Sequence, residues 1–177
     1  MWIRLLFCFG FVLFFGNSSS AQDVFEAART GNVKQLKKLI ALNKDTIQAL
    51  SPMGFDPLMI ACYRGQTKCA AFLIAQGADV NRSSAEGSAL QAACYQNNTE
   101  LALLLIKRGA GLNTQGPDGN TALMYAVLNQ NLKLVKTLTR VGADLKLTNK
   151  DGQTAYSLAM TQRNTEIQKT VQIPVKN

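Results

Sequence analysis

The chain has 177 residues, of which 47% are hydrophobic and 17% charged, a balance that suits one folded domain and excludes wholesale disorder. It contains no histidine, which excludes Ser-His-Asp and Cys-His catalytic sites and removes the commonest metal ligand. Its formal charge of +8 would suit an anionic partner, but the basic residues are scattered rather than gathered in a run with interleaved aromatics. We therefore expect a solvated basic face and no nucleic-acid partner.

Residues 1–21 differ in composition from the remainder of the chain. Arg4 is followed by an apolar run from Leu5 to Phe15 and then by a small, polar stretch that ends at Ala21. This order is typical of a secretory signal peptide, and we expect cleavage after Ala21. The alternative is a membrane anchor, but a spanning helix needs about 20 apolar residues, and this run is shorter. The mature protein is then expected to be soluble, free of the membrane and outside the cytoplasm, in the periplasm or secreted.

A unit of 32 or 33 residues repeats along the chain. The phrases GADVN, GAGLN and GADLK begin at Gly77, Gly109 and Gly142. At the same spacing, a polar residue is followed by proline or alanine, in Asp56–Pro57, Ser88–Ala89, Thr121–Ala122 and Thr154–Ala155. Each pair predicts a helix start, because the polar side chain accepts a free backbone N–H and proline or alanine suits the first helical position.

A second helix is predicted in each unit. The first helices run for about two turns, to near Gly65, Asn97, Gln130 and Arg163. After one of them, Leu132, Val135 and Leu138 recur at three-residue spacing, which places them on one helical face. The second helices are expected to stop at the glycines of the GA phrases, since glycine accepts the left-handed conformation that closes a helix. Turns written EGS, DGN and DGQ then start the next units at Glu86, Asp118 and Asp151.

This unit resembles the ankyrin repeat, whose motif is roughly D-G-x-T-P-L-H-x-A-A, a second helix, and G-A-D-V-N. Residues 54–81 and 118–146 carry most of the motif, while 24–43 resemble a first repeat without its turn and 151–171 a closing repeat. The resemblance implies an all-α solenoid of stacked helix-turn-helix units with β-turn loops. The expected divisions are a signal peptide (1–21), an N-terminal capping repeat (22–52), repeats at 53–85, 86–117 and 118–150, and a C-terminal capping repeat with a tail (151–177).

The motif's histidine is missing from every copy. Its position is occupied by Met59, Gln91, Met124 and Ser157. Because that histidine usually hydrogen-bonds to neighbouring turns in the family, we expect the turns of this chain to be held more loosely.

Three cysteines would remain after cleavage, and an odd number leaves at least one thiol unpaired within a monomer. Cys62 and Cys94 hold the same position in adjacent repeats, which stack about 8–10 Å apart, farther than a disulfide reaches. Cys62 and Cys69 could meet across one helix pair. We expect small, buried, reduced thiols, whereas an exposed thiol of low pKa would indicate a redox role.

The resemblance implies protein recognition through turn tips and the concave face of the first helices. One column through three repeats holds Tyr63, Tyr95 and Leu128. Tyrosine and arginine are enriched at binding hot spots, but these tyrosines could instead pack together and close the groove. The residues that follow the column are Arg64, Gln96 and Asn129. The candidates at the turn tips are Arg82, Ser84, Glu86, Gln115, Asp118, Thr148, Lys150 and Asp151.

We therefore expect an exported, monomeric adaptor that binds another protein, with no catalytic residue, no metal and no cofactor. One alternative is a redox-linked protective factor that uses the cysteines. Another is a secreted effector that binds a host protein.

Overall fold

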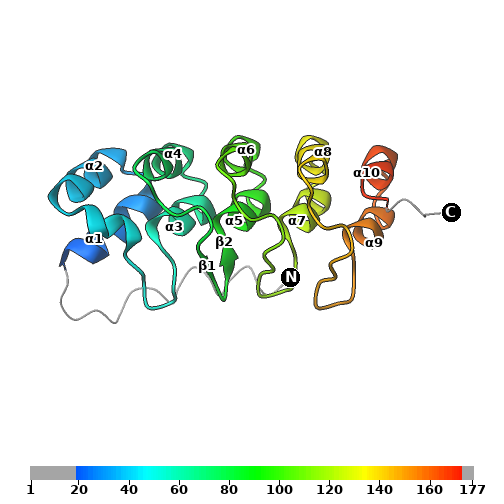
Figure 1. Cartoon of the computed structure of the whole chain (residues 1–177), viewed down its shortest axis with the longest axis horizontal. Helices are drawn as coiled ribbons and strands as arrows, with labels where there is room; N and C mark the ends of the chain where they lie inside the picture. Colours follow the sequence, from blue (N-terminus) through cyan, green and yellow to red (C-terminus); the bar gives the residue numbers. More distant parts are fainter. Residues whose placement is uncertain (1–18, 173–177) are drawn as a thin grey trace.

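The computed structural model describes residues 19–172. Residues 1–18, and with them most of the expected signal peptide, lie outside the described residues. Five helix pairs stand side by side in one row (Figure 1). The first helices of the pairs are α1 (Ser19–Thr30), α3 (Pro57–Tyr63), α5 (Ala89–Tyr95), α7 (Ala122–Leu128) and α9 (Ala155–Met160). The second helices are α2 (Val33–Leu42), α4 (Thr67–Ala75), α6 (Thr99–Lys107), α8 (Leu132–Arg140) and α10 (Thr165–Thr170).

The expected helix starts are confirmed at all four positions. Asp56, Ser88, Thr121 and Thr154 each accept the backbone N–H three residues ahead, with N···O distances of 2.7, 3.4, 3.3 and 3.1 Å. Each of these residues is extended, and the helix begins at the proline or alanine that follows. The starts depend on neighbours in the chain, which is why the sequence places them correctly.

The expected second-helix ends are confirmed as well. Gly77, Gly109 and Gly142 have φ of 95°, 79° and 97°, and each comes two residues after the last helical one. The first helices end at an equivalent left-handed residue, which is Gly65 in one repeat but Asn97 and Gln130, both with φ of 54°, in the next two. A residue other than glycine is strained in this conformation, because its Cβ crowds the backbone.

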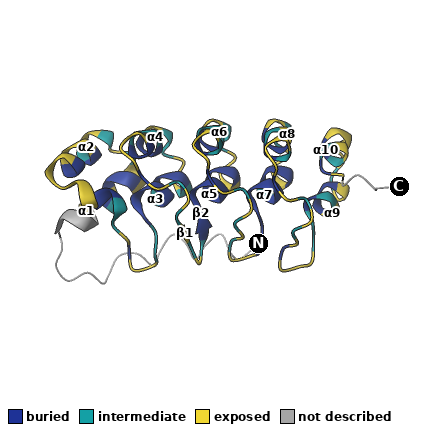
Figure 2. Cartoon of the chain, viewed as in Figure 1, coloured by how far each residue is buried: buried dark blue, intermediate teal, exposed yellow. Residues whose placement is uncertain are grey.

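The core is a continuous strip between the two helical layers, dark blue in Figure 2. Leu58, Leu90 and Leu123 from the first helices are fully buried, as are the leucines that face them from the second helices. Each pair buries its apolar face against the next pair, so the repeats are stable only as a stack. None of the helices in the described range is both long and apolar enough to cross a bilayer.

Two short elements were not expected from the sequence. A 3-10 helix, η1 (Lys44–Gln48), follows α2 and buries Ile47. Strands β1 (Ser83–Ser84) and β2 (Gly87–Ser88) form an antiparallel hairpin in the turn before α5. The hairpin lies in one of the loops that project from the side of the first helices (Figure 1), whereas η1 packs against α1, α2 and α3.

Candidate interaction surface

A hollow of about 510 Å³ lies where α5 and α7 meet the turn that precedes α7. Its lining comprises Tyr95, Gln96, Asp118, Asn120, Tyr125, Leu128 and Asn129. Tyr95 is 52% and Leu128 44% exposed, so two large apolar side chains from adjacent repeats face solvent side by side. We call this hollow the Tyr95 groove.

Tyr125 forms the wall of the Tyr95 groove together with Asp118. Its ring meets the ring of Tyr95 edge to face, with the centroids 5.4 Å apart and an angle of 80° between the planes. Its hydroxyl has one proton to donate to the Asp118 carboxylate, whose two oxygens lie 3.0 and 2.9 Å from the phenolic oxygen. Burial, and then the hydrogen bond to Asp118, raises the pKa of Tyr125. The carboxylate is fixed further by the backbone and side-chain N–H groups of Asn120, at 2.9 and 2.6 Å.

Tyr63, the first residue of the predicted column, differs from Tyr95 and Leu128. Its hydroxyl donates to the backbone carbonyl of Glu86, and its ring packs edge to face on Phe55. Burial, with the nearby charges of Glu86 and Asp118, raises the pKa of Tyr63 to about 12. Tyr63 is half-buried and its polar tip is already bonded, so it closes its part of the groove.

Gln96 and Asn129 use their amides to join successive repeats. Gln96 donates to the carbonyl of Tyr63 at 2.7 Å. Asn129 donates to the carbonyl of Cys94 at 2.8 Å and more weakly to that of Tyr95. Both residues border the groove, but their donors hold the helix ends in register. Arg64, at the same position one repeat earlier, is exposed.

The row of helix pairs and the repeated loops agree with the comparison to known families. The family model for ankyrin repeats (3 copies) matches residues 24–116 and 90–172. The chain belongs to the ankyrin-repeat family. Ankyrin repeats are generally protein-interaction modules, and the family is generally non-catalytic.

Curated relatives match over single stretches of the repeats. Ankyrin repeat domain-containing protein 29 of Danio rerio is 39% identical over 61 residues, which are 34% of this chain and 20% of that protein. Its human counterpart is 38% identical over 61 residues, with the same shares of the two chains. Inversin of Gallus gallus is 39% identical over 69 residues, 39% of this chain and 6% of inversin. The chain therefore spans a fifth or less of the length of these relatives.

The turn tips of the ankyrin repeats are tied to one another. Arg82 donates to the side chain of Gln48 at 2.9 Å and lies 3.7 Å from the buried carboxylate of Asp56. Gln115 donates to the carbonyls of Gly119 and Thr148, at 2.7 and 2.8 Å. These predicted contact residues thus hold the loops in place. Lys150 keeps an exposed side chain.

Tyr125 and Asn120 line the groove but were not among the predicted site residues. Tyr125 precedes Leu128 and Asn129 by three and four positions, the spacing that puts side chains on one helical face. That spacing could have identified Tyr125 from the sequence. No sequence signal pointed to Asn120, because its role is to donate to the carboxylate of Asp118.

Gln91 forms the hydrogen bond to a neighbouring turn that the family's histidine usually forms. It is buried, its amide donates to the carbonyl of Asn120 at 2.6 Å, and its carbonyl accepts the backbone N–H of Ser88. Asn149 continues this link by donating to the side chain of Asn120 at 3.1 Å. The expectation of loosely held turns is therefore wrong for the three turns that these residues connect, since an amide provides the inter-repeat bond.

The three described cysteines are free and buried, as expected. Burial raises the pKa of Cys94 to about 12, and it raises the pKa of Cys62 and Cys69 as well. Reactive cysteines are exposed and have a lowered pKa. The three thiols are buried and have a raised pKa, so none of them is the reactive group that the redox alternative needs.

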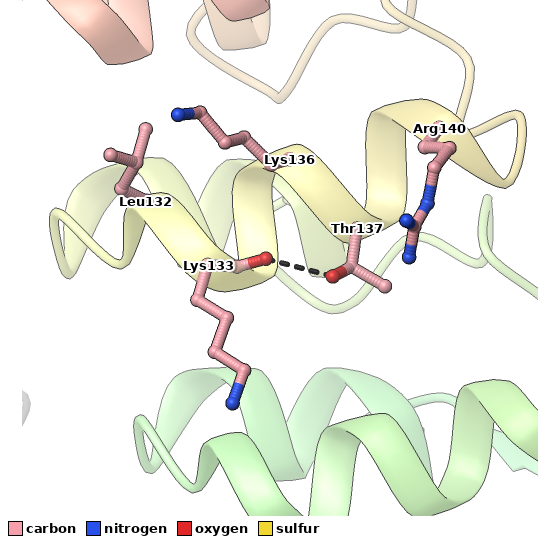
Figure 3. Close-up of a pocket in the computed structure, with 5 residues that line it drawn as sticks. All are labelled: Leu132, Lys133, Lys136, Thr137 and Arg140. Atoms are coloured by element: carbon pink, nitrogen blue, oxygen red, sulfur yellow. Dashed lines mark hydrogen bonds between the residues drawn. The ribbon is translucent and has the colours of Figure 1, made fainter.

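A second hollow, of about 420 Å³, lies on α8 on the opposite layer of the solenoid (Figure 3). It is lined by Leu132, Lys133, Lys136, Thr137 and Arg140. The hydroxyl of Thr137 donates to the carbonyl of Lys133 in its own helix, and Lys136 pairs with Glu166 on α10 at 3.3 Å. Its polar groups are thus satisfied or solvated, which agrees with the expected solvated basic face.

Proposed function

We propose that this ankyrin-repeat protein is an exported adaptor that binds another protein through the Tyr95 groove. The observation that carries the proposal is the exposure of Tyr95 and Leu128 next to each other in a hollow. Burying such side chains against a partner is favourable, at roughly 25 cal/mol per Å² of apolar surface.

Preorganisation supports the same surface. Gln96 and Asn129 are held by carbonyls of the preceding repeat, and Tyr125 is held by Asp118. A partner would therefore meet side chains whose conformational freedom is already restricted, which lowers the entropy cost of binding. The groove combines residues of the successive helices α5 and α7 with a turn whose Asp118 is hydrogen-bonded to Tyr125 of α7.

Export rests on the order of basic, apolar and small polar residues in 1–21. A secreted effector is a second candidate that uses the same groove and differs only in the partner. The cellular source of the captured protein separates these two candidates.

The test is capture of a partner from the exported fraction of the native cell by the protein and by a Tyr95→Ala/Leu128→Ala variant. We expect the variant to lose the partner while its circular dichroism spectrum and melting temperature stay close to those of the parent. A Leu42→Ala/Leu50→Ala variant is the matched control, because those leucines are also exposed but lie in the N-terminal repeat. Loss of the partner with this control, or its retention by the groove variant, would refute the groove as the binding site.

A further inference from the structure

We propose that the Tyr95 groove receives a cationic side chain, arginine in preference to lysine, from the bound segment of the partner. Asp118 supplies the counter-charge and the ring of Tyr95 supplies the platform. The inference rests on the proposed function, since it names the chemistry of the segment that occupies the groove.

The charge of the groove differs in sign from that of the protein. Asp118 is the charged residue among those that line the groove. The protein as a whole carries +8, and its second helices hold many of the lysines. Those on the second helices are Lys34, Lys37, Lys38, Lys68, Lys107, Lys133, Lys136 and Lys169. A cationic segment is therefore repelled by the second-helix layer and attracted to the groove.

The position of Asp118 restricts the occupant further. A segment that covers Tyr95 and Leu128 also removes water from Asp118, because the three side chains line one hollow. A carboxylate that loses water without gaining a cation is costly. A purely apolar segment would leave the Asp118 carboxylate desolvated and unpaired, and an acidic segment would also repel it. A segment that carries a cation avoids the unpaired charge and the repulsion.

The geometry favours arginine over lysine. The carboxylate of Asp118 already accepts the backbone and side-chain N–H of Asn120 and the hydroxyl of Tyr125. Since a carboxylate has about four acceptor sites, about one remains, and the Tyr125 oxygen has donated its proton and is still able to accept. A guanidinium has five donors in one plane and can stack on an aromatic face while it reaches both acceptors. An ammonium group lacks the plane that stacks on Tyr95.

The experiment is a selection of linear twelve-residue peptides from a random library on the immobilised mature protein. We expect enriched peptides to share an arginine flanked by apolar residues, and synthetic versions to bind about tenfold more weakly when citrulline replaces that arginine. Citrulline keeps the planar shape and removes the charge. Asp118→Asn should weaken binding to the same degree and abolish the arginine preference.

Asp151→Asn is the matched control, because Asp151 is an exposed aspartate in the equivalent turn of the next repeat. It should leave peptide binding unchanged. An Asp118→Lys variant should enrich peptides with glutamate or aspartate in place of arginine. Melting temperatures of all variants show whether the fold is kept.

Two outcomes would overturn the inference in different ways. Enriched peptides that lack a cation, yet lose binding with Tyr95→Ala/Leu128→Ala, would refute the cation site and leave the groove as a protein-binding surface. A selection in which no peptide depends on Tyr95 and Leu128 would count against both the cation site and the proposed function.

Discussion

The side-chain amide of Gln91 donates to the backbone carbonyl of Asn120, 29 residues away, at 2.6 Å. The same side chain accepts the N–H of Ser88, which completes a capping box at the start of α5. One buried residue therefore fixes a helix start and the turn of the following repeat. Met59 and Met124 hold the same position in neighbouring repeats and have no amide to do this.

Replacing Gln91 with methionine, the residue of the neighbouring repeats, should destabilise the protein. The Ser88 N–H would lose its buried partner, which costs about 1–3 kcal/mol, whereas the Asn120 carbonyl would keep the backbone N–H of Gly116 as its partner. Urea unfolding followed by circular dichroism measures the change. Ser157→Ala is the control, since Ser157 holds the same position but is exposed and bonds only within its own turn. An unfolding midpoint unchanged in Gln91→Met would show that the amide contributes little.

Gln130→Gly should raise the free energy of unfolding by up to about 1 kcal/mol, because Gln130 has φ of 54° and a side chain is strained there. Gly65→Ala, at the equivalent position with φ of 66°, should lower it. A Cβ at Gly65 would meet no atom within 4 Å, so the loss reports the backbone conformation and not a clash. The two midpoints in urea should therefore move in opposite directions. Movement in the same direction would contradict this account of the helix ends.

The native mature protein, prepared from Gln22 onward so that it lacks Cys8, should not react with a thiol reagent such as 5,5′-dithiobis(2-nitrobenzoic acid) near pH 8. Cys62, Cys69 and Cys94 should all react once it is unfolded in guanidinium. The reason is that all three are buried and that burial raises their pKa. Rapid labelling of a native thiol would revive the redox alternative.

Because burial raises the pKa of these thiols, we expect the protein to lose stability at high pH. Burial raises the pKa of Cys94 from 9.0 to about 12, so the neutral thiol stabilises the fold fully below pH 9. This contribution falls as the pH rises from 9 through about 12, by up to about 1.4 kcal/mol per pH unit, because the unfolded chain loses the proton first. Urea unfolding between pH 8 and 10.5 measures the slope. The slope should be shallower in Cys94→Ala, and an equal slope in the two proteins would contradict the prediction.

The protein recovered from the exported fraction should begin at Gln22, as measured by its intact mass. Cleavage after Ala21 would shorten α1, which starts at Ser19, by three residues and keep its buried Val24, Ala27 and Ala28. Ala21→Phe should block processing, because the cleavage site needs a small residue. Recovery of the full-length chain from the parent would refute the signal peptide.

The sequence by itself determined where four of the first helices begin and where three of the second helices end. Asp56 caps α3 through a bond to a residue three positions ahead, and Gly77 closes α4 through its own φ. Such interactions are local, so they can be read from spacing and residue type. The repeat of these signals at 32 or 33 residues then sufficed to predict the stack.

Only the tertiary structure decided which side chains are free to bind. Tyr63 and Tyr95 occupy one column of the sequence, yet the hydroxyl of Tyr63 is bonded to Glu86 and Tyr95 is exposed. The side-chain amide of Gln96 likewise donates to the backbone carbonyl of Tyr63, 33 residues earlier. These bonds join residues about one repeat apart, and they depend on how closely neighbouring repeats approach and at what angle. Residue type and spacing do not fix that approach, because it results from the packing of the whole stack.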